Sequence, residues 1–204
     1  MTDRELLITL LAERSSKKGH FILASGRESQ FYIDARLTTM SPDGLAVIGR
    51  LGLLTIQQSS WPVEAIGGLT LGADPISYAI SHASAGSPQP LRAFTVRKEA
   101  KTHGTGQVIE GPFRPSDHVI VIEDVITTGS SALRAIDAVR NAGGTVSGVL
   151  AVVDRQEGGR EALESAGVPV IALTTASEIM AILEKRGDQP ESPSASIPGK
   201  QPTA

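Results

Sequence analysis

Two adjacent acids, Glu123 and Asp124, directly follow the apolar run VIVI at residues 119–122. The chain then passes through hydroxyl residues and a glycine, Thr127 to Ser131, before a segment with helical periodicity. Main-chain N–H groups at a helix start, with hydroxyls and a glycine that permits close approach, form a cradle for phosphate. Neighbouring carboxylates accept hydrogen bonds from vicinal sugar hydroxyls or hold a hydrated Mg²⁺. This segment therefore favours a ligand with a phosphate and a diol, as in a ribose 5-phosphate.

Simpler explanations exist for each part of this segment. Serine and threonine residues before a helix are ordinary N-caps, and acids at the end of a strand are often solvated. No GKS or GKT follows the segment, so it is not a Walker loop, and its glycine spacing does not match a dinucleotide fingerprint. These residues alone leave the phosphate-binding and the plain structural interpretation open.

A second group of chemically active side chains lies in RKEAKTHGTG, residues 97–106. Arg97, Lys98, Lys101 and His103 lie within seven positions, and the glycines provide hinges. The polar, glycine-rich stretch continues well beyond the histidine, and connections of that length are usually functional or mobile. Cations of this kind suit a multiply charged phosphate ligand, and a solvated basic surface loop is the alternative.

Apolar runs that alternate with helical patterns must position these groups. The best helical pattern is SSALRAIDAVRNAGG, in which Leu133, Ile136 and Val139 share one face. Strand–helix–strand alternation predicts a mostly parallel sheet with helices on both faces, and such sheets bind ligands at the carboxyl ends of their strands. The acids and the start of the basic segment should therefore meet at one edge. The predicted strands are 63–68, 91–96, 118–123, 146–154 and 168–173.

The N-terminal part of the chain is built differently. Thr2 and Glu5 have the spacing of a capping box, so a helix should follow them. A second helix should begin at Ser41, with Pro42 in its first turn. Between these helices, residues 19–36 mix aromatic and β-branched residues around a glycine, which predicts short strands joined by a turn.

Composition limits the class of protein. The chain of 204 residues has the length of one domain, a net charge of −3 and no cysteine. The charge argues against a nucleic-acid binder, and the lack of cysteine excludes disulfides and thiolate metal sites. No apolar run is long enough to cross a membrane, and the N-terminus lacks a signal-peptide pattern, so we expect a cytoplasmic protein without membrane contact. The proline- and serine-rich end, residues 187–204, should be a disordered tail.

Four segments in order resemble a known family. VIVIEDVITTGSS resembles the 5-phosphoribosyl 1-diphosphate (PRPP) binding motif of type I phosphoribosyltransferases. RKEAKTHGTG is similar to the catalytic loop of orotate phosphoribosyltransferases, FILASGRESQFYIDAR to their N-terminal hood, and GGLTLGADPI to their diphosphate-binding loop. The resemblance implies an α/β protein with the type I phosphoribosyltransferase fold, a mostly parallel doubly wound sheet with a small N-terminal hood. One domain would span residues 1–186, with the hood at about 19–36 after the N-terminal helix and the core at about 41–186.

The resemblance also implies roles for individual residues. The catalytic side chains would be those of Lys98, Lys101, His103 and Arg97. PRPP would contact Glu123, Asp124, Val125, Ile126, Thr127, Thr128, Gly129, Ser130 and Ser131. Orotate would contact Thr127, Arg155, Phe31 and Tyr32; the alternatives are that the two aromatic residues belong to the core and that Arg155 forms a surface salt bridge. No side chain is expected to ligate a metal directly, because Mg²⁺ would be held through PRPP and water; Asp124 and Asp74 are the candidates otherwise.

This chain departs from the family pattern at two positions. Some relatives have a lysine in the diphosphate loop and another just before the SG of the hood, whereas this chain has Leu71 and Ala24 there. Side-chain cations cannot contribute at these positions. Any diphosphate contact at residues 70–72 would therefore come from the backbone.

The implied reaction joins the small molecules orotate and PRPP to give orotidine 5′-phosphate and diphosphate, with Mg²⁺, in pyrimidine biosynthesis. The resemblance also implies a homodimer in which Arg97, Lys101 and His103 reach the neighbouring site while Lys98 serves its own. Two alternatives stay open: transfer to another nucleobase, and a non-catalytic PRPP-sensing regulator on the same fold. Arg155 and the basic loop argue against the first, and the negative charge argues against the second.

Overall fold

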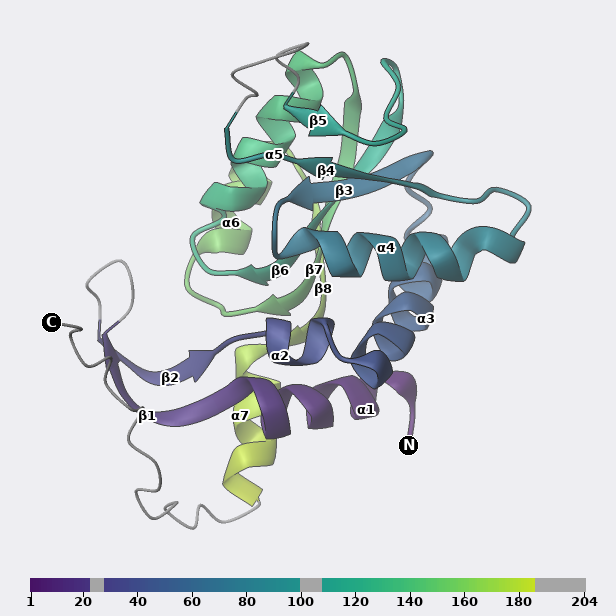
Figure 1. The fold of residues 1–204 in the computed structure, drawn as a ribbon. Coiled ribbons are helices and arrows are strands. Elements are labelled where there is room, and N and C mark those ends of the chain that lie inside the picture. Colours follow the sequence, from purple (N-terminus) through teal and green to yellow (C-terminus); the bar gives the residue numbers. More distant parts are fainter. Residues whose placement is uncertain (23–27, 100–107, 186–204) are drawn as a thin grey trace, which may run out of the picture.

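The computed structural model describes residues 1–22, 28–99 and 108–185. Their central feature is a six-stranded sheet with the strand order β5-β4-β3-β6-β7-β8 (Figure 1). Neighbouring strands are parallel except for the short β5, which runs antiparallel to β4. The predicted, mostly parallel sheet is therefore confirmed. Its strands are β3 (Ala65–Leu69), β4 (Arg92–Val96), β5 (Ile109–Glu110), β6 (His118–Ile126), β7 (Thr145–Asp154) and β8 (Val170–Thr175).

Helices cover both faces of this sheet (Figure 1). Val119 and Val121 of β6 pack in one core with α5 and α6, whereas Ile120 and Ile122 face a second core with α1, α3, α4 and α7. Successive β6 side chains point to opposite faces, and both faces are buried, so the strand is a continuous apolar run. The helices are α1 (Asp3–Leu10), α2 (Arg36–Thr39), α3 (Pro42–Ser59), α4 (Ala73–Ala83), α5 (Ser130–Asn141), α6 (Gly159–Ser165) and α7 (Ala176–Lys185), with a π-helical turn at Leu11–Ser15 and a 3₁₀ turn at Ser84–Gly86.

The N-terminal segment forms the predicted hood. An antiparallel hairpin of β1 (Ser16–Ile22) and β2 (Glu28–Ile33) follows α1 and precedes α2. Thr2 and Glu5 form the expected capping box, with both of its hydrogen bonds present. Ser41 caps α3 by accepting a hydrogen bond from the main-chain N–H of Gly44 at 3.2 Å. Local capping chemistry thus sets where these helices begin.

Several element boundaries differ from the sequence-based expectation. β6 extends to Ile126 rather than ending at Glu123, because Val125 and Ile126 still pair with β7. Glu123 and Asp124 therefore lie inside a strand. β8 is displaced by two residues, and α5 begins at Ser130. β5 was not predicted, because two residues are too short to produce a pattern.

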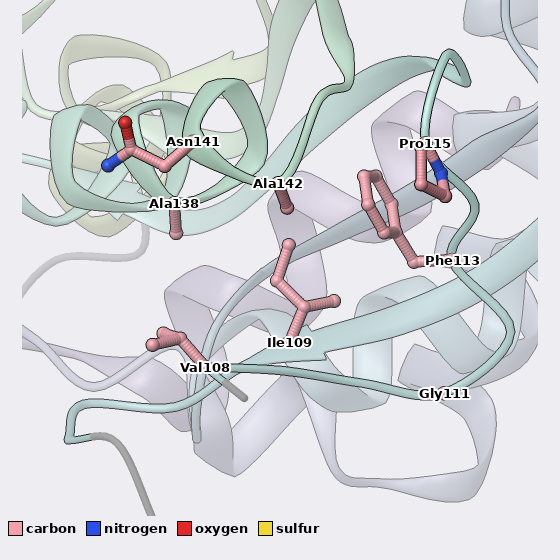
Figure 2. A pocket seen from close by; sticks show the side chains of 8 residues that line it. All are labelled: Val108, Ile109, Gly111, Phe113, Pro115, Ala138, Asn141 and Ala142. Carbon is pink, nitrogen blue, oxygen red and sulfur yellow. The ribbon is translucent and has the colours of Figure 1, made fainter. Parts of the chain in front are cut away.

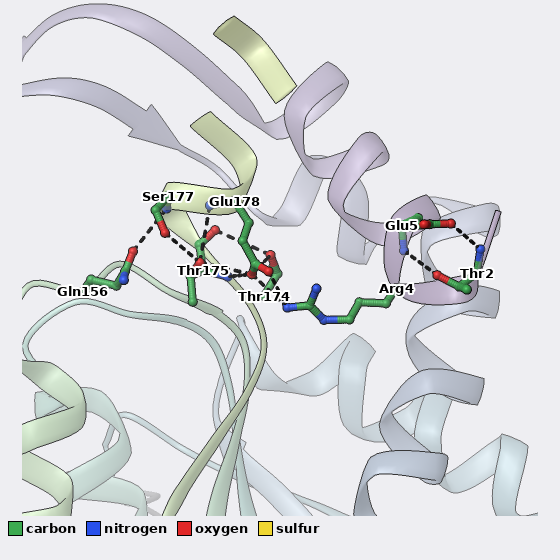
Figure 3. Close-up of polar contacts among 8 residues, drawn as sticks. All are labelled: Thr2, Arg4, Glu5, Gln156, Thr174, Thr175, Ser177 and Glu178. Carbon is green, nitrogen blue, oxygen red and sulfur yellow. Dashed lines mark hydrogen bonds and ion pairs between the residues drawn. The ribbon is translucent and has the colours of Figure 1, made fainter. Parts of the chain in front are cut away.

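Polar contacts connect both ends of the described chain to the turn after β7 (Figure 3). Arg4 of α1 donates from Nη2 to the two carboxylate oxygens of Glu178 at 2.7 and 2.9 Å. One residue before Glu178, the main-chain N–H of Ser177 donates to the side-chain oxygen of Gln156 at 3.2 Å. Because Gln156 directly follows Arg155, helix α7 braces the turn that carries this arginine.

The sequence also led to expectations about membrane contact and about the C-terminal end. No helix in the three described ranges combines the length and apolarity that a membrane crossing requires. The predicted disordered tail at 187–204, and Ala24 in the hood, lie outside the described residues.

Candidate active site

A cavity of about 320 Å³ opens at the carboxyl edge of the sheet, where the sequence predicted the ligand to bind. Segments far apart in the sequence meet there: the end of the hood, the loop after β3, the residues after β4, the β6–α5 segment and the turn after β7. The predicted site residues that line it are Tyr32, Lys98, Glu123, Asp124, Val125, Thr127, Ser131 and Arg155. The other lining residues are Ile33, Asp34, Ala35, Arg36, Leu69, Thr70, Leu71 and Gly72.

Glu123 is the most buried of the polar side chains in this cavity. It is only 7% exposed, and its Oε2 atom has no hydrogen-bond partner among the described residues. Burial, reinforced by the neighbouring Asp124, raises the pKa of Glu123 to about 9. A pKa raised in this way favours the protonated form of Glu123 at neutral pH, whereas the sequence analysis treated both acids as anionic acceptors. The cause is the extension of β6, which keeps Glu123 within the packed sheet.

Asp124 faces the loop that follows β3. Its Oδ1 atom accepts a hydrogen bond from the main-chain N–H of Val125 at 2.8 Å. An added Cβ atom at Gly72 would lie 2.6 Å from Asp124 Oδ2, so a side chain at that position would displace the carboxylate. Glycine at position 72 therefore allows the predicted diphosphate loop to lie directly against the acid pair.

The predicted phosphate loop ends in the first turn of α5. Gly129 caps this helix with φ +79°, a left-handed conformation that glycine adopts without strain. The hydroxyl oxygens of Thr128 and Ser130 lie 3.1 Å apart across the turn. The start of α6 packs against the loop from behind, because a Cβ atom at Gly159 would lie 2.6 Å from the carbonyl oxygen of Thr127. The turn is thus held rigidly where the helix N–H groups point at an anion.

Arg155 is a buried side chain, not the surface salt bridge that was the alternative. Its side chain is 7% exposed, and its Nε atom donates to Glu157 Oε1 at 2.7 Å. Its Nη2 atom also donates to the carbonyl oxygen of Phe31 at 3.3 Å, which joins the turn after β7 to the hood. The main-chain N–H of Arg155 donates to Ile126 at 2.9 Å. These contacts hold a planar, two-pronged cation at the cavity wall.

The basic segment reaches the cavity through Lys98. The carbonyl oxygen of Lys98 accepts a hydrogen bond from Nη2 of Arg134 in α5 at 2.9 Å, which ties the segment to the helix of the phosphate loop. Arg97 does not line the cavity; its Nη1 atom lies 3.5 Å from Glu110 Oε1. The predicted catalytic residues Lys101 and His103 lie outside the described residues.

The two aromatic residues of the hood have different surroundings. Tyr32 is 39% exposed, lines the cavity and packs on Phe21 with ring centroids 5.5 Å apart. Phe31 is 7% exposed and belongs to the core with α1 and α3. In β2 the two side chains lie on opposite sides of the strand, with Tyr32 at the cavity and Phe31 in the core. The Phe31 ring is therefore not a platform for a base, and only its carbonyl group reaches the site through Arg155.

Asp74 has a structural role. Its Oδ2 atom accepts a hydrogen bond from the Thr70 hydroxyl at 2.6 Å, and its Oδ1 atom accepts one from the Thr95 hydroxyl at 2.8 Å. Both carboxylate oxygens are thus engaged, and Asp74 does not line the cavity. These hydrogen bonds anchor the loop after β3 to β4, and the suggestion that Asp74 ligates a metal or a water stays a prediction. In the described ranges, no group of three or more His, Asp or Glu side chains is arranged to hold a metal ion.

Asp34 and Arg36 are lining residues that sequence analysis did not single out. They follow β2 directly, so the only available signal was an acid and a base, two positions apart, at the end of a predicted strand. Arg36 donates from Nε to Asp34 Oδ1 at 2.8 Å and from Nη2 to Oδ2 at 2.9 Å. Sequence spacing alone does not reveal that α2 turns this pair toward the acids of β6.

A second hollow, of about 460 Å³, lies between β5 and the C-terminal end of α5 (Figure 2). Apart from the Asn141 amide its lining side chains are apolar, with Ile109 and Phe113 facing Ala138 and Ala142. None of the predicted site residues lines it. Its greater volume does not make it the active site, because the titratable groups converge at the carboxyl edge instead.

The parallel sheet, the hood and an acid pair beside a helix-terminal phosphate loop define a type I phosphoribosyltransferase. No protein-family model matches the chain. Among curated proteins it is 46% identical over 184 residues to the orotate phosphoribosyltransferase of Synechocystis, covering 90% of this chain and 91% of the relative. The Aquifex aeolicus enzyme of the same name is 45% identical, covering 88% and 99%. The chain belongs to the orotate phosphoribosyltransferase family.

Solved structures agree with this assignment. The orotate phosphoribosyltransferase of Mycobacterium tuberculosis, crystallised with PRPP, superimposes with a TM-score of 0.73 at 39% identity, covering 87% of this chain and 99% of that one. Adenine phosphoribosyltransferase from Leishmania donovani, at 16% identity and a TM-score of 0.67, shares the fold. The predicted fold class, family and enzyme class are confirmed.

Proposed function

We propose that this enzyme transfers the 5-phosphoribosyl group of PRPP to orotate, giving orotidine 5′-phosphate and diphosphate, and that the carboxyl-edge cavity is where it does so. The single observation that carries this assignment is the convergence of the β6 acids, the α5 phosphate loop and Arg155 on one cavity in a chain 46% identical to an orotate phosphoribosyltransferase. Each of these three groups suits a different part of the two substrates.

The sugar phosphate would bind along the β6–α5 segment. The phosphate would accept hydrogen bonds from the N–H groups and hydroxyls of residues 127–131. The ribose hydroxyls would meet Asp124 and Glu123, with Asp124 as acceptor and protonated Glu123 able to donate as well as accept. The two acids differ in burial: both line the cavity, but Glu123 is buried whereas Asp124 is partly exposed.

Orotate would bind between the hood and the turn after β7. A guanidinium group matches a carboxylate in a planar, paired arrangement, and Arg155 is held in position for it by Glu157. Tyr32 offers an exposed aromatic face to the pyrimidine, and Thr127 is within the same cavity wall for a hydrogen bond. The Phe31 ring has no part in this proposal.

The reaction requires stabilisation of a departing diphosphate. Cleavage at C1 of the ribose should run ahead of bond formation, so the protein's task is to align both substrates and neutralise the developing negative charge. Lys98 lines the cavity and would supply part of this positive charge. We expect Lys101 and His103 to supply more from the same loop. No general base is assigned, because the reacting nitrogen of orotate is already acidic.

The donor groups of the cavity fit a role for Mg²⁺. Asp124 presents a carboxylate beside the loop at 70–72, and oxygen ligands of this kind suit a hard cation that keeps several waters. Bound together with PRPP, Mg²⁺ would offset charge on the diphosphate. The protein's contribution would be to orient that charge through Asp124, with no further side-chain ligand required.

We also propose a cytoplasmic homodimer with shared active sites. Among the described residues, the exposed apolar side chains of Leu37, Met40 and Leu71 line one hollow beside α2, and Leu54 of α3 and Tyr78 of α4 are exposed as well. A patch of this kind supports an interface, and Leu71 connects it to the active site. Mixing Lys101→Ala chains with Asp124→Asn chains should restore activity above either parent, and no recovery would contradict shared sites.

A spectrophotometric assay tests the assignment directly. Orotate absorbance should fall on addition of PRPP and Mg²⁺, and mixtures without PRPP serve as controls. A panel of free nucleobases should give no comparable turnover; turnover of a purine or uracil with none of orotate would favour the first alternative. DNA binding that responds to PRPP, without turnover of any base, would favour the regulator.

A further inference from the structure

The loop after β3, which is the predicted diphosphate loop, contributes no cation to the cavity wall. Leu71 lines the cavity and is 56% exposed. The neighbouring lining residues of this loop are Leu69, Thr70 and Gly72, none of which carries charge. Main-chain N–H groups alone would have to meet a diphosphate with several negative charges, which a side-chain cation would stabilise better.

Arg36 lies at the place where that cation is missing. It lines the active-site cavity together with Leu71, Gly72 and Asp124. Arg36 and Leu71 also line a separate, more open hollow beside α2, so the two residues are neighbours in both places. The Asp124 charge contributes to raising the pKa of Arg36, after the larger effect of Asp34. The guanidinium group is therefore within electrostatic reach of the acid that borders the predicted diphosphate site.

The position of the Arg36 side chain is set before any ligand arrives. Asp34 accepts hydrogen bonds from Nε and Nη2, and the main-chain N–H of Asp34 donates to Ser15 at 2.8 Å. Nη1 of Arg36 makes no hydrogen bond to any described residue, so its N–H groups are available to an incoming anion. With its side chain 50% exposed, Arg36 can accept such a ligand without breaking the pair with Asp34.

The other two cations of the described cavity wall have different places. Arg155 is buried against Glu157 at the turn after β7. Lys98 follows β4, with its carbonyl group tied to α5. Neither shares the hollow beside α2 with Leu71. Arg36 is thus the guanidinium that the hood contributes opposite the phosphate loop.

We propose that Arg36 binds the diphosphate group of PRPP and provides, from the hood, a positive charge beside the uncharged loop at residues 70–72. This inference rests on the proposed function and adds a substrate-binding residue to the same site. The charge comes from the hood, and it acts beside the loop at residues 70–72.

The test compares Arg36→Ala, Arg36→Lys and the double variant Arg36→Ala/Leu71→Lys with the wild type. Arg36→Ala should raise the KM for PRPP and the inhibition constant for diphosphate by about 10-fold or more, in the range of a lost charged hydrogen bond, while the KM for orotate changes less than about twofold. Arg36→Lys should keep part of the affinity. The double variant should recover most of it, because it returns a cation to the neighbouring position.

Arg4→Ala is the matched control. Arg4 also pairs with a single acid, its side chain is 48% exposed, and it lies away from the cavity (Figure 3). It should leave the KM for PRPP unchanged. Melting temperatures of all variants show whether a loss reflects unfolding. Recovery by Leu71→Lys is a result that a purely structural role for Arg36 would not produce.

Two outcomes would overturn the proposal: a PRPP KM and diphosphate constant within twofold of wild type in Arg36→Ala, or a loss that Leu71→Lys does not recover. Calorimetric titration with Mg²⁺ and diphosphate measures the same affinity without turnover. If the wild type proves inactive toward orotate but binds diphosphate through Arg36, the proposed base is wrong and the Arg36 inference stands. If the wild type uses orotate but diphosphate binds equally well without Arg36, the proposed function stands and the Arg36 inference is wrong.

Discussion

The two walls of the active-site cavity are built in different ways. The motif wall is formed by Glu123, Asp124, Val125, Thr127 and Ser131, which belong to one continuous segment that runs from β6 into α5. The assembled wall consists of residues 32–36, residues 69–72, Lys98 and Arg155, which come from four separate places in the chain. In a continuous segment, the spacing of residues along the chain fixes where each group lies. In an assembled wall, a charged side chain can reach the same place from a different segment of the chain.

This difference sets how each wall responds to a substitution. In the segment of the motif wall, each hydroxyl and glycine serves the geometry of a single turn, so a substitution has no neighbour to replace it. In the assembled wall, leucine at position 71 is tolerated if Arg36 of the hood supplies the charge. Substitutions in each wall therefore test this difference.

The largest effect is expected for Lys98→Ala in the assembled wall. Removing a cation that meets the departing diphosphate should lower kcat by about 100-fold or more, the range for one lost electrostatic contact in a transition state. Steady-state kinetics with saturating orotate and PRPP measure it. A kcat close to wild type would remove Lys98 from the mechanism and leave the assembled wall with a binding role only.

Arg155→Ala should separate the two substrates. Loss of the guanidinium should raise the KM for orotate by about 10-fold or more, while the KM for PRPP changes much less, because the residue lies on the base side of the cavity. Glu157→Gln should give a smaller change of the same kind, since Glu157 holds Arg155. Equal effects on both Michaelis constants would show that Arg155 does not recognise the base.

Gly72→Ala tests the contact between the two walls. The added Cβ atom would lie 2.6 Å from Asp124 Oδ2, so the carboxylate or the loop must shift. We expect the KM for PRPP to rise by roughly 3- to 10-fold, with a smaller change for orotate, as misplaced binding groups typically cost. Gly86→Ala, where a Cβ atom meets nothing within 4 Å, is the control. Unchanged PRPP kinetics in Gly72→Ala would mean that Asp124 does not need its present position.

Glu123→Gln tests the motif wall through stability. The pKa of Glu123 is raised from 4.5 to about 9, so between these values the folded protein holds a proton that the unfolded chain releases. The stability of the wild type should therefore fall as pH rises through this window. The variant removes this penalty, and its melting temperature should exceed that of wild type by a few degrees at pH 8 and by less at pH 5.

Glu161→Gln, on the exposed side of α6, is the control for this measurement. It should leave the pH dependence of the melting temperature as it is in the wild type. A gap between Glu123→Gln and wild type that is the same at both pH values would show that the carboxyl group titrates normally. PRPP affinity of Glu123→Gln, measured in parallel, shows whether the stability gained comes at the expense of ribose binding.

Much of the site could be predicted from local patterns. Strand, acid pair and helix start are consecutive, which predicted a place at the carboxyl edge for Glu123, Asp124, Thr127 and Ser131, and all four line the cavity there with Arg155. Protonation of Glu123 could not be predicted, because it depends on two further residues of β6 that pair only when β7 is alongside. Which of the two aromatic side chains faces the cavity follows from how β2 is placed. The sequence alone did not show whether Phe31 and Tyr32 contact the ligand or belong to the core.

By itself, the sequence determined the alternation of strands and helices, the capped starts of α1 and α3, and the phosphate loop, because each depends on residues a few positions apart. Only the folded chain brings Asp34 and Arg36 into one cavity with Asp124, ties Asp74 to Thr70 and Thr95, and buries Glu123 so that its pKa rises to about 9. These properties depend on burial and on charges brought together across the fold, and spacing along the chain contains neither.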